Sequence, residues 1–289
     1  MKKIVLLIST LAVFALVGCY DWGKDSETDS ETYQASLFNR VEIETANGTI
    51  SASVTTDTMI TVTLTRWADG INAHEHMLNI DVSVTKDTAD SLLRIYVDIP
   101  INVGYNAGCD AKLVLPESLY IDLVSSNGAI DVDGHKVGMY LETSNASVDV
   151  QNTTGDAEIR TTNGAVETND TKGYYKIESS NASVTVYDHE GNMEAVTSNG
   201  AIEAEVAMSK EDGICRFETS NAHIGVAVPD SVYADIYMRT SNADIDVEIP
   251  GIGDTNSDDD IFEGHMGQGT TPGDIYLVTS NGSVTLKKL

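Results

Sequence analysis

The sequence predicts an all-β protein: a β-solenoid that stacks single-stranded, β-helix-like coils of about 18 residues, with an N-terminal β cap. A Ser/Thr-x-Asn-Gly/Ala motif recurs along the chain, and apolar residues alternate with polar ones on both sides of each copy. No proline lies between residues 117 and 228, where its missing N–H would interrupt a strand ladder. The five prolines flank this region, at Pro100, Pro116, Pro229, Pro250 and Pro272.

The repeated motif centres on nine asparagines, with four successive spacings of 18 residues between Asn127 and Asn199. They are Asn47, Asn127, Asn145, Asn163, Asn181, Asn199, Asn221, Asn242 and Asn281. A unit of this length cannot bury its apolar side alone, whereas stacked units share a continuous core.

Each copy of the motif separates two short strands. Met139 and Leu141 precede Asn145, and Val148 and Val150 follow it, so both sides have the period of two expected of a half-buried strand. The phase changes by one residue across the motif, which predicts a bend there. This phase places the asparagines inward, where their amides would form a structural hydrogen-bonded ladder from coil to coil.

A finer pattern leaves the coil length open. The motif alternates between Asn-Gly-Ala and Asn-Ala-Ser from Asn127 to Asn199, so a 36-residue coil with two motifs is an alternative to the preferred 18-residue coil. Residues 38–116 carry longer alternating runs and are interpreted as a β cap continuous with the solenoid. Residues 117–289 hold the repeats, with a Gly- and Asp-rich insertion at 250–273.

Residues 1–18 are predicted to be a signal peptide, because Lys2 and Lys3 precede an apolar run. It ends in Leu16-Val17-Gly18-Cys19, which resembles the lipobox of prokaryotic lipoproteins. That resemblance implies cleavage before Cys19 and a lipid on its thiol, anchoring the protein to the outside of the membrane. A plain secretory signal and an uncleaved anchor are the alternatives. Residues 19–37 then read as the lipid-anchor cysteine and an acidic tether with little to pack.

Charge excludes one class of function. The chain has 45 Asp and Glu against 17 Lys and Arg, a formal net charge of −28, so it cannot neutralise a phosphate backbone and no nucleic-acid partner is expected. Acidic residues recur at outward strand positions such as Glu142, Glu158 and Glu203. The sequence therefore predicts an exterior that is acidic throughout.

Little in the chain points to chemistry. Cys109 and Cys215 fall in core phase and are expected to be buried free thiols. His74-Glu75-His76 lacks a third zinc ligand and is expected in a solvated loop. Asp254, Asn256, Asp258 and Asp260 begin like a calcium loop, but Asp259 replaces the required glycine and His265 the final glutamate, so only a looser calcium site is an alternative to a solvated loop. No catalytic motif is present, so no enzyme and no other cofactor are expected.

Two further segments support a family resemblance. A Gly-rich stretch, Gly264-His265-Met266-Gly267-Gln268-Gly269, precedes a final Leu277-Val278-Thr279-Ser280-Asn281-Gly282-Ser283-Val284. Together with the repeated motif, they resemble the bacterial and archaeal β-strand-repeat family of unknown function labelled "putative adhesin". The resemblance covers residues 38–289 and implies an all-β solenoid at the cell surface or in the envelope, without agreed catalytic residues.

The sequence thus favours a non-enzymatic, lipid-anchored surface protein, either adhesin-like or an envelope scaffold. The alternatives are a polysaccharide-binding or polysaccharide-cleaving β-helix protein and an envelope sensory or assembly partner. The expected partners are the membrane, through the lipid, and a surface glycan or envelope protein. Asn152 and Asn169 are turn sequons that could carry a glycan.

Overall fold

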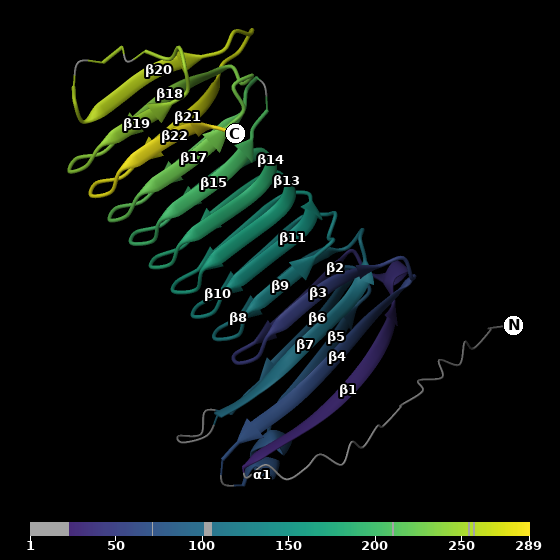
Figure 1. Cartoon of the computed structure of the whole chain (residues 1–289). Helices are drawn as coiled ribbons and strands as arrows, with labels where there is room; N and C mark the ends of the chain where they lie inside the picture. Colours follow the sequence, from purple (N-terminus) through teal and green to yellow (C-terminus); the bar gives the residue numbers. More distant parts are fainter. Residues whose placement is uncertain (1–22, 71, 101–105, 210, 254, 257) are drawn as a thin grey trace, which may run out of the picture.

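The computed structural model describes residues 23–289 except 71, 101–105, 210, 254 and 257. The predicted signal peptide and Cys19 lie outside the described residues. The described chain is almost entirely β: twenty-two strands form one hydrogen-bonded sheet, accompanied by the helix α1 (Ala73–Leu78) and a 3-10 turn at Ala35–Leu37. Figure 1 shows the strands stacked side by side along one long axis.

The sheet runs through two layers that enclose the core. Layer 1 contains, in spatial order, β5 (Asp81–Asp87), β6 (Leu92–Asp98), β2 (Arg40–Thr45), β8 (Tyr120–Ser125), β10 (Met139–Thr143), β12 (Ala157–Thr161), the second halves of β13 (Val166–Glu178) and β14 (Val184–Val196), β16 (Ile214–Glu218), β21 (Gly273–Val278), β18 (Ala234–Arg239) and β20 (Ile261–Met266).

Layer 2 is built in the same way. It contains β1 (Lys24–Gln34), β4 (Met59–Asp69), β7 (Asn106–Pro116), β3 (Ile50–Thr55), β9 (Ile130–Asp133), β11 (Val148–Thr154), the first halves of β13 and β14, β15 (Ile202–Ala207), β17 (Ile224–Val228), β22 (Val284–Lys288) and β19 (Ile245–Glu248). Neighbouring strands of the repeats pair in parallel, as do β2 and β3 with the strands beside them. The antiparallel pairs among the described strands lie at the two ends of the stack: β1–β4, β4–β7 and β5–β6 at one end and β18–β20 at the other.

Neighbouring strands of the central repeats are offset by 18 residues. Leu141 lies opposite Ile159, and Ile159 lies opposite Ile177, and all three side chains are fully buried. Each layer therefore contributes continuous apolar columns to one core. The offset agrees with the 18-residue spacing and excludes 36 residues as the step between adjacent strands.

Packing at the bend explains why Gly and Ala alternate after the asparagine. A Cβ atom added to Gly164 would lie 1.5 Å from the carbonyl oxygen of Ala146 on the adjacent turn. The spatial neighbours Gly200 and Ala182 repeat this arrangement, with a distance of 1.8 Å. Each glycine thus allows close approach of the backbone of the preceding turn, and the two-turn sequence pattern follows from this contact.

The inward position predicted for the asparagines is wrong. Eight of the nine are exposed and Asn47 is half-buried. The inward position belongs to the Ser or Thr two residues earlier: Thr161 is 8% exposed, and its hydroxyl accepts the N–H of Gly164 at 3.0 Å. This hydroxyl caps the bend from inside and turns the asparagine outward.

The exposed amides nevertheless contact one another, and we call the nine residues the asparagine row. In eight of the nine, Nδ2 donates to the Oδ1 of a neighbouring asparagine over 2.6–2.9 Å, whereas Nδ2 of Asn47 donates to the Ala107 carbonyl. The spatial order is Asn47, Asn127, Asn145, Asn163, Asn181, Asn199, Asn221, Asn281 and Asn242.

The order of Asn281 and Asn242 reflects interleaving at both ends of the stack. The last strands of the chain, β21 and β22, lie between β16–β17 and β18–β19. Likewise β2 and β3 lie between β8–β9 and β6–β7. The C-terminal strands β21 and β22 are therefore paired on both edges, as are β2 and β3, whereas β1 pairs only with β4 among the described strands.

The prediction of an unpacked acidic tether is wrong for most of residues 19–37. Residues Lys24–Gln34 form β1, which pairs antiparallel with the whole of β4. Arg66 on β4 binds Glu27 and Asp29 at 2.8 and 2.9 Å, and Tyr33 is buried. Opposite charges on β4 and one apolar anchor stabilise a strand whose composition alone indicates disorder.

Candidate functional site: the tyrosine face

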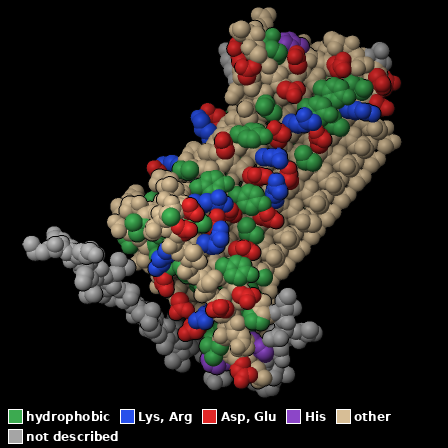
Figure 2. All heavy atoms as spheres, turned by 180° about the vertical axis from the view of Figure 1, so that it is seen from behind, with side chains coloured by type: hydrophobic (Ala, Val, Ile, Leu, Met, Phe, Trp, Pro, Cys, Tyr) green, Lys and Arg blue, Asp and Glu red, His purple; other side chains and the backbone are tan. Residues whose placement is uncertain are grey.

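The outer surface of layer 1 gathers most of the chain's arginines and many of its tyrosines. We call this surface the tyrosine face. It carries Arg40, Arg94, Arg160, Arg216, Arg239, Lys176, Tyr96, Tyr120, Tyr140, Tyr174, Tyr237 and Tyr276, interspersed with carboxylates and a few valines. Figure 2 shows hydrophobic, basic and acidic side chains alternating along one side of the stack.

The strand register arranges these side chains in columns along the stack. The central column runs through Glu158, Lys176, Glu194, Arg216, Tyr276 and Tyr237, one from each successive strand. A neighbouring column runs through Glu142, Arg160, Glu178, Val196, Glu218, Val278 and Arg239. Opposite charges therefore lie beside each other within and between strands.

Ion pairs fix the basic side chains on this face. Nζ of Lys176 lies 2.6 Å from a carboxylate oxygen of Glu178, and the Arg160 guanidinium lies 2.6 Å from Glu158. The hydrogen bond from Lys176 lowers the pKa of Glu178 from its ordinary value, with the charge of Lys176 as a further cause. Because these groups are partly exposed, the pairs orient side chains more than they stabilise the fold.

Aromatic rings stand between the charges. The rings of Tyr237 and Tyr276 are stacked, with centroids 5.2 Å apart and planes 11° from parallel. The Arg216 guanidinium lies 4.5 Å from the centroid of the Tyr276 ring. Arg216, Tyr276 and Tyr237 therefore follow one another along the central column. Such stacked arginine and tyrosine side chains lose little conformational freedom on binding, and both residue types are enriched at binding hot spots.

Two phenols of this face, those of Tyr174 and Tyr140, donate hydrogen bonds to carboxylates. Tyr174 donates to Glu194 at 2.6 Å, which is the main cause of its pKa being raised to about 12. Burial and a hydrogen bond to Glu142 raise the pKa of Tyr140 to about 12. Both phenols are therefore neutral hydrogen-bond donors near neutral pH.

The outer surface of layer 2 has a different composition. Its outward side chains include Asp131, Asp133, Asp149, Glu167, Glu203, Glu205, Asp246 and Glu248, with Lys112 and Lys287 as basic exceptions. Asp131 and Asp149 lie directly opposite each other on neighbouring strands. Burial is the main cause that raises the pKa of Asp131, and the nearby charge of Asp149 is the second. We call this surface the acidic face. The prediction of an exterior acidic throughout therefore holds for layer 2 but is wrong for layer 1.

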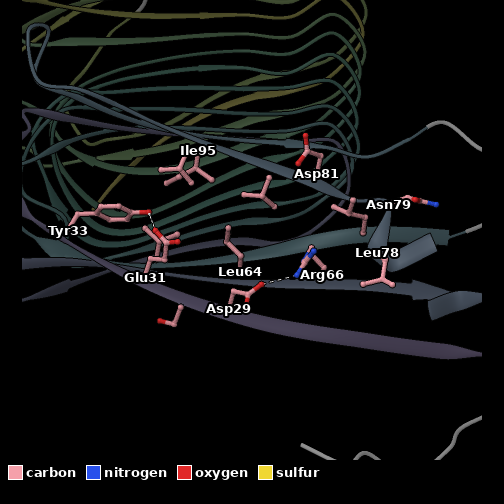
Figure 3. A pocket seen from close by; sticks show the side chains of 14 residues that line it. Asp29, Glu31, Tyr33, Leu64, Arg66, Leu78, Asn79, Asp81 and Ile95 are labelled. Atoms are coloured by element: carbon pink, nitrogen blue, oxygen red, sulfur yellow. Dashed lines mark hydrogen bonds and ion pairs between the residues drawn. The ribbon is translucent and has the colours of Figure 1, made fainter. Parts of the chain in front are cut away.

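A cavity of about 590 Å³ opens at the N-terminal end of the stack, between β1–β4 and β5–β6. Val62, Leu64, Val82 and Ile95 give it an apolar floor. Figure 3 shows the charged rim, where Asp29 faces Arg66 and Glu31 faces Tyr33. Asp29 and Glu31 on this rim already have partners, and the floor offers room for an apolar group.

The structure separates the other predicted site residues from this face. The asparagine row follows the bends at its edge, and Asn152 and Asn169 are exposed at the opposite bend. Asp254 lies outside the described residues. Oδ1 atoms of Asn256 and Asp258 accept the backbone N–H groups of Asp258 and Asp260, and the described residues contain no group of three or more side chains placed to hold a metal ion. The structure thus gives the calcium alternative no support.

The predicted histidine and cysteine positions lie off the outer surface of layer 1. His74 and His76 lie in α1 rather than in a loop, and His74 Nδ1 contacts Asp25 at 2.6 Å. Cys109 and Cys215 are buried free thiols, as predicted, and burial raises the pKa of each to about 12. A thiol so poorly ionised is unreactive near neutral pH.

Sequence reasoning did not identify the tyrosine face, although the signal was present. Tyr140 lies five residues before Asn145, and Tyr276 five before Asn281; Arg216 lies five before Asn221. The outward position five residues before the motif asparagine thus holds tyrosine, lysine or arginine in several repeats. The strand after the asparagine does not show this pattern. Comparing the strand before each asparagine with the strand after it would have found this difference.

Among the described residues, no helix combines the length and apolar character needed to cross a membrane.

Neither family models nor curated proteins match this chain. Solved structures resemble it at low identity. A "putative cell adhesion protein" from Clostridium sporogenes matches at 8% identity over 92% of this chain and 100% of its own, with a TM-score of 0.28. A "putative adhesin" from Parabacteroides distasonis matches at 9% over 91% and 98%, with a TM-score of 0.38, and one from Bacteroides fragilis at 14% over 91% and 97%, with a TM-score of 0.28.

Proposed function

We propose that this chain is a non-enzymatic, lipid-anchored β-solenoid that acts at the cell surface as an adhesin-like binding module. The observation that carries the proposal is the one-sided distribution of tyrosine and arginine: five of the six arginines project from layer 1. Tyrosine and arginine are enriched where proteins bind other molecules. An exterior shaped only by solubility would not gather six tyrosines and five arginines on layer 1 while Tyr187 projects from layer 2.

The length of the stack suits presentation of that face. Layer 2 contains twelve strands in spatial order, so at about 4.8 Å between strands it extends roughly 50 Å. Under the lipoprotein hypothesis the lipid on Cys19 precedes Lys24 by five residues, which span at most about 18 Å. The stack would then begin close to the membrane and display its tyrosine face along its whole length.

The asparagine row would serve this architecture as a structural ladder. Its eight amide hydrogen bonds run along one edge of the solenoid, each joining one coil to the next. Each exposed bond adds little stability alone. Together they would hold the coils in one register and keep the binding face straight.

A polysaccharide ligand is the second candidate, because tyrosine rings and ion-paired polar groups can also recognise sugars. Polysaccharide cleavage is less well supported than binding. On the tyrosine face, Glu158, Glu178 and Glu218 are each paired with a basic group within 3.0 Å. A general acid needs a raised pKa, whereas the pKa of Glu178 is lowered; burial raises the pKa of Asp122 on the same face, but that carboxylate accepts a hydrogen bond from Arg40.

Two measurements test the proposal. Mass spectrometry of the mature protein should find an N-terminal Cys19 carrying a lipid, and Cys19→Ala should release the chain from the membrane. Cells that display Tyr276→Ser should adhere less to their target than cells that display Thr285→Ser on the acidic face. An unmodified Cys19 would contradict the anchor. Equal adhesion of the two variants would contradict a binding role for the tyrosine face.

A further inference from the structure

We propose that the partner of the tyrosine face is a second copy of the same face, with the two stacks antiparallel. This inference deepens the proposed function by naming the partner of that site. It rests on three properties of the face: its area, its charge relative to the rest of the molecule, and the order of charges along its columns.

The area fits a dimer interface. The ten strands from β6 to β18 in layer 1 span about 43 Å along the stack, and five residues of each strand span about 16 Å across it. The face therefore offers about 700 Å² per copy, close to the roughly 800 Å² that each partner contributes to a stable complex.

Charge directs two copies to this face. A chain with a net charge of −28 repels its own copies. On the acidic face, the carboxylates Asp131, Asp149 and Glu167 follow one another in one column, so a copy whose corresponding column faced these residues would place acid against acid. The tyrosine face alternates signs instead, so a second copy can meet it with unlike charges.

The column order selects one orientation. A two-fold axis parallel to the strands, between β12 and β13, sets each strand against its counterpart in reverse order and keeps the columns aligned. Glu158 then faces Lys176 of the other copy, and Arg160 faces Glu178. The relation is reciprocal, so each of these contacts occurs twice.

Strands farther from the axis continue the match. Strand β10 faces β14, which places Tyr140 against Glu194 and Glu142 against Val196. Strand β8 faces β16, which places Asp122 against Arg216.

Strand β2 faces β21, which places Arg40 against Asp274. None of the pairs from these described strands sets like charges together.

A parallel pairing matches the charges less completely. A two-fold axis along the central column would set Lys176 on Lys176 and Arg216 on Arg216, and like charges at such contacts oppose association. An axis midway between the two columns would set Lys176 against Glu178, but it would also set Glu42 against Glu44 on β2, a like pair that the antiparallel arrangement avoids. The antiparallel pair is therefore the favoured one, and its two N-terminal ends lie at opposite ends of the dimer. Lipid anchors at those ends would insert into two different membranes, so the contact would join one cell surface to another.

The central contact allows a charge-swap test. The chain from residue 19 onward, with Cys19→Ala, contains every described residue and is suitable for sedimentation equilibrium. We expect a monomer–dimer equilibrium in the wild type. Lys176→Glu and Glu158→Lys should each weaken it at least tenfold, while Lys287→Glu, an equal charge change on the acidic face, should leave it unchanged.

Mixing the two weakened variants provides the decisive measurement. In the heterodimer, Glu158 of one copy meets Lys176 of the other, and the swapped pair meets as lysine and glutamate. Association should therefore return to near the wild-type value in the mixture, and within-chain effects of either substitution cannot produce that recovery. Matching circular dichroism spectra of both variants confirm that each is folded.

Three outcomes would overturn the inference. These are a wild type that stays monomeric at 100 µM, a dimer that only Lys287→Glu weakens, or a mixture that does not recover. Vesicles carrying the lipidated full chain test the biological role separately. If the soluble chain dimerises as described and the vesicles do not cluster, self-pairing stands and the adhesin proposal fails.

Discussion

The side-chain amide of Asn281 donates a 2.8 Å hydrogen bond to Oδ1 of Asn221, 60 residues earlier in the chain, and Asn242 is the next neighbour beyond Asn281. The C-terminal strands therefore lie inside the stack instead of at its end. β22 is paired with β17 on one edge and with β19 on the other.

This position predicts the pattern of amide hydrogen exchange. Amides of β22 should exchange about as slowly as those of β15, although β22 ends the chain. Amides of β19, which has one unpaired edge among the described strands, should exchange at least tenfold faster, because edge strands open at lower free energy. Exchange that slows steadily from the C-terminus inward would contradict the interleaved order.

The alternation of glycine and alanine at the bends predicts opposite responses at adjacent positions. Gly164→Ala should lower the free energy of unfolding by more than about 2 kcal/mol, because the new Cβ meets the Ala146 carbonyl at 1.5 Å and the backbone has to move.

The reverse substitution on the next turn, Ala182→Gly, is the matched control. It creates no contact and should cost at most about 1 kcal/mol through backbone entropy. Urea denaturation measures both variants. Equal costs would show that the close approach at Gly164 does not determine the alternation.

The repeat spacing and the strand alternation predict the strands, the bends and the 18-residue register, because these depend on local periodicity. The direction of the asparagines could not be predicted in this way. Period two continues up to the bend but does not say whether Thr161 or Asn163 turns inward, and the cap from the Thr161 hydroxyl to Gly164 decides this.

Long-range pairing accounts for the other differences. Residues 24–34 have a disordered composition, and only the partner strand with Arg66 makes them β1. The position of Asn281 between Asn221 and Asn242 depends on pairing between strands about 60 residues apart in the chain. No local sequence pattern predicts that pairing. The tyrosine face is visible only when the strands before and after each asparagine are assigned to different layers.

The exposed position of the asparagine row predicts a modest stability effect. Asn163→Ala removes one bond donated to Asn145 and one accepted from Asn181, both at the surface, so it should cost about 1–2 kcal/mol. An inward amide would leave buried polar groups unpaired and cost more.

Asn169→Ala is a suitable control, since Asn169 is exposed at the other bend and lies outside the row. We expect a change within about 0.5 kcal/mol for this variant. If both variants unfold at the same urea concentration, the row contributes nothing to stability.

Two buried histidines predict a dependence of stability on pH. Burial lowers the pKa of His135 and His189 to about 4, and each side chain is at most 1% exposed. Burial keeps His189 neutral, although one ring nitrogen contacts the Asn192 carbonyl at 3.1 Å, which by itself would raise the pKa; the other contacts the Thr171 hydroxyl at 2.8 Å.

In the unfolded chain a histidine binds its proton near pH 6.5, so between pH 6.5 and 4 the unfolded state holds more protons than the folded state. Stability therefore falls as the pH falls through this window, by on the order of 3 kcal/mol for each histidine once pH 4 is reached. Glutamine at position 189 cannot be protonated. Between pH 7.5 and pH 4, the free energy of unfolding of His189→Gln should therefore fall by about 3 kcal/mol less than that of the wild type. Urea denaturation at half-unit pH steps measures the difference, and parallel curves for the two proteins would show that His189 is already protonated in the folded chain.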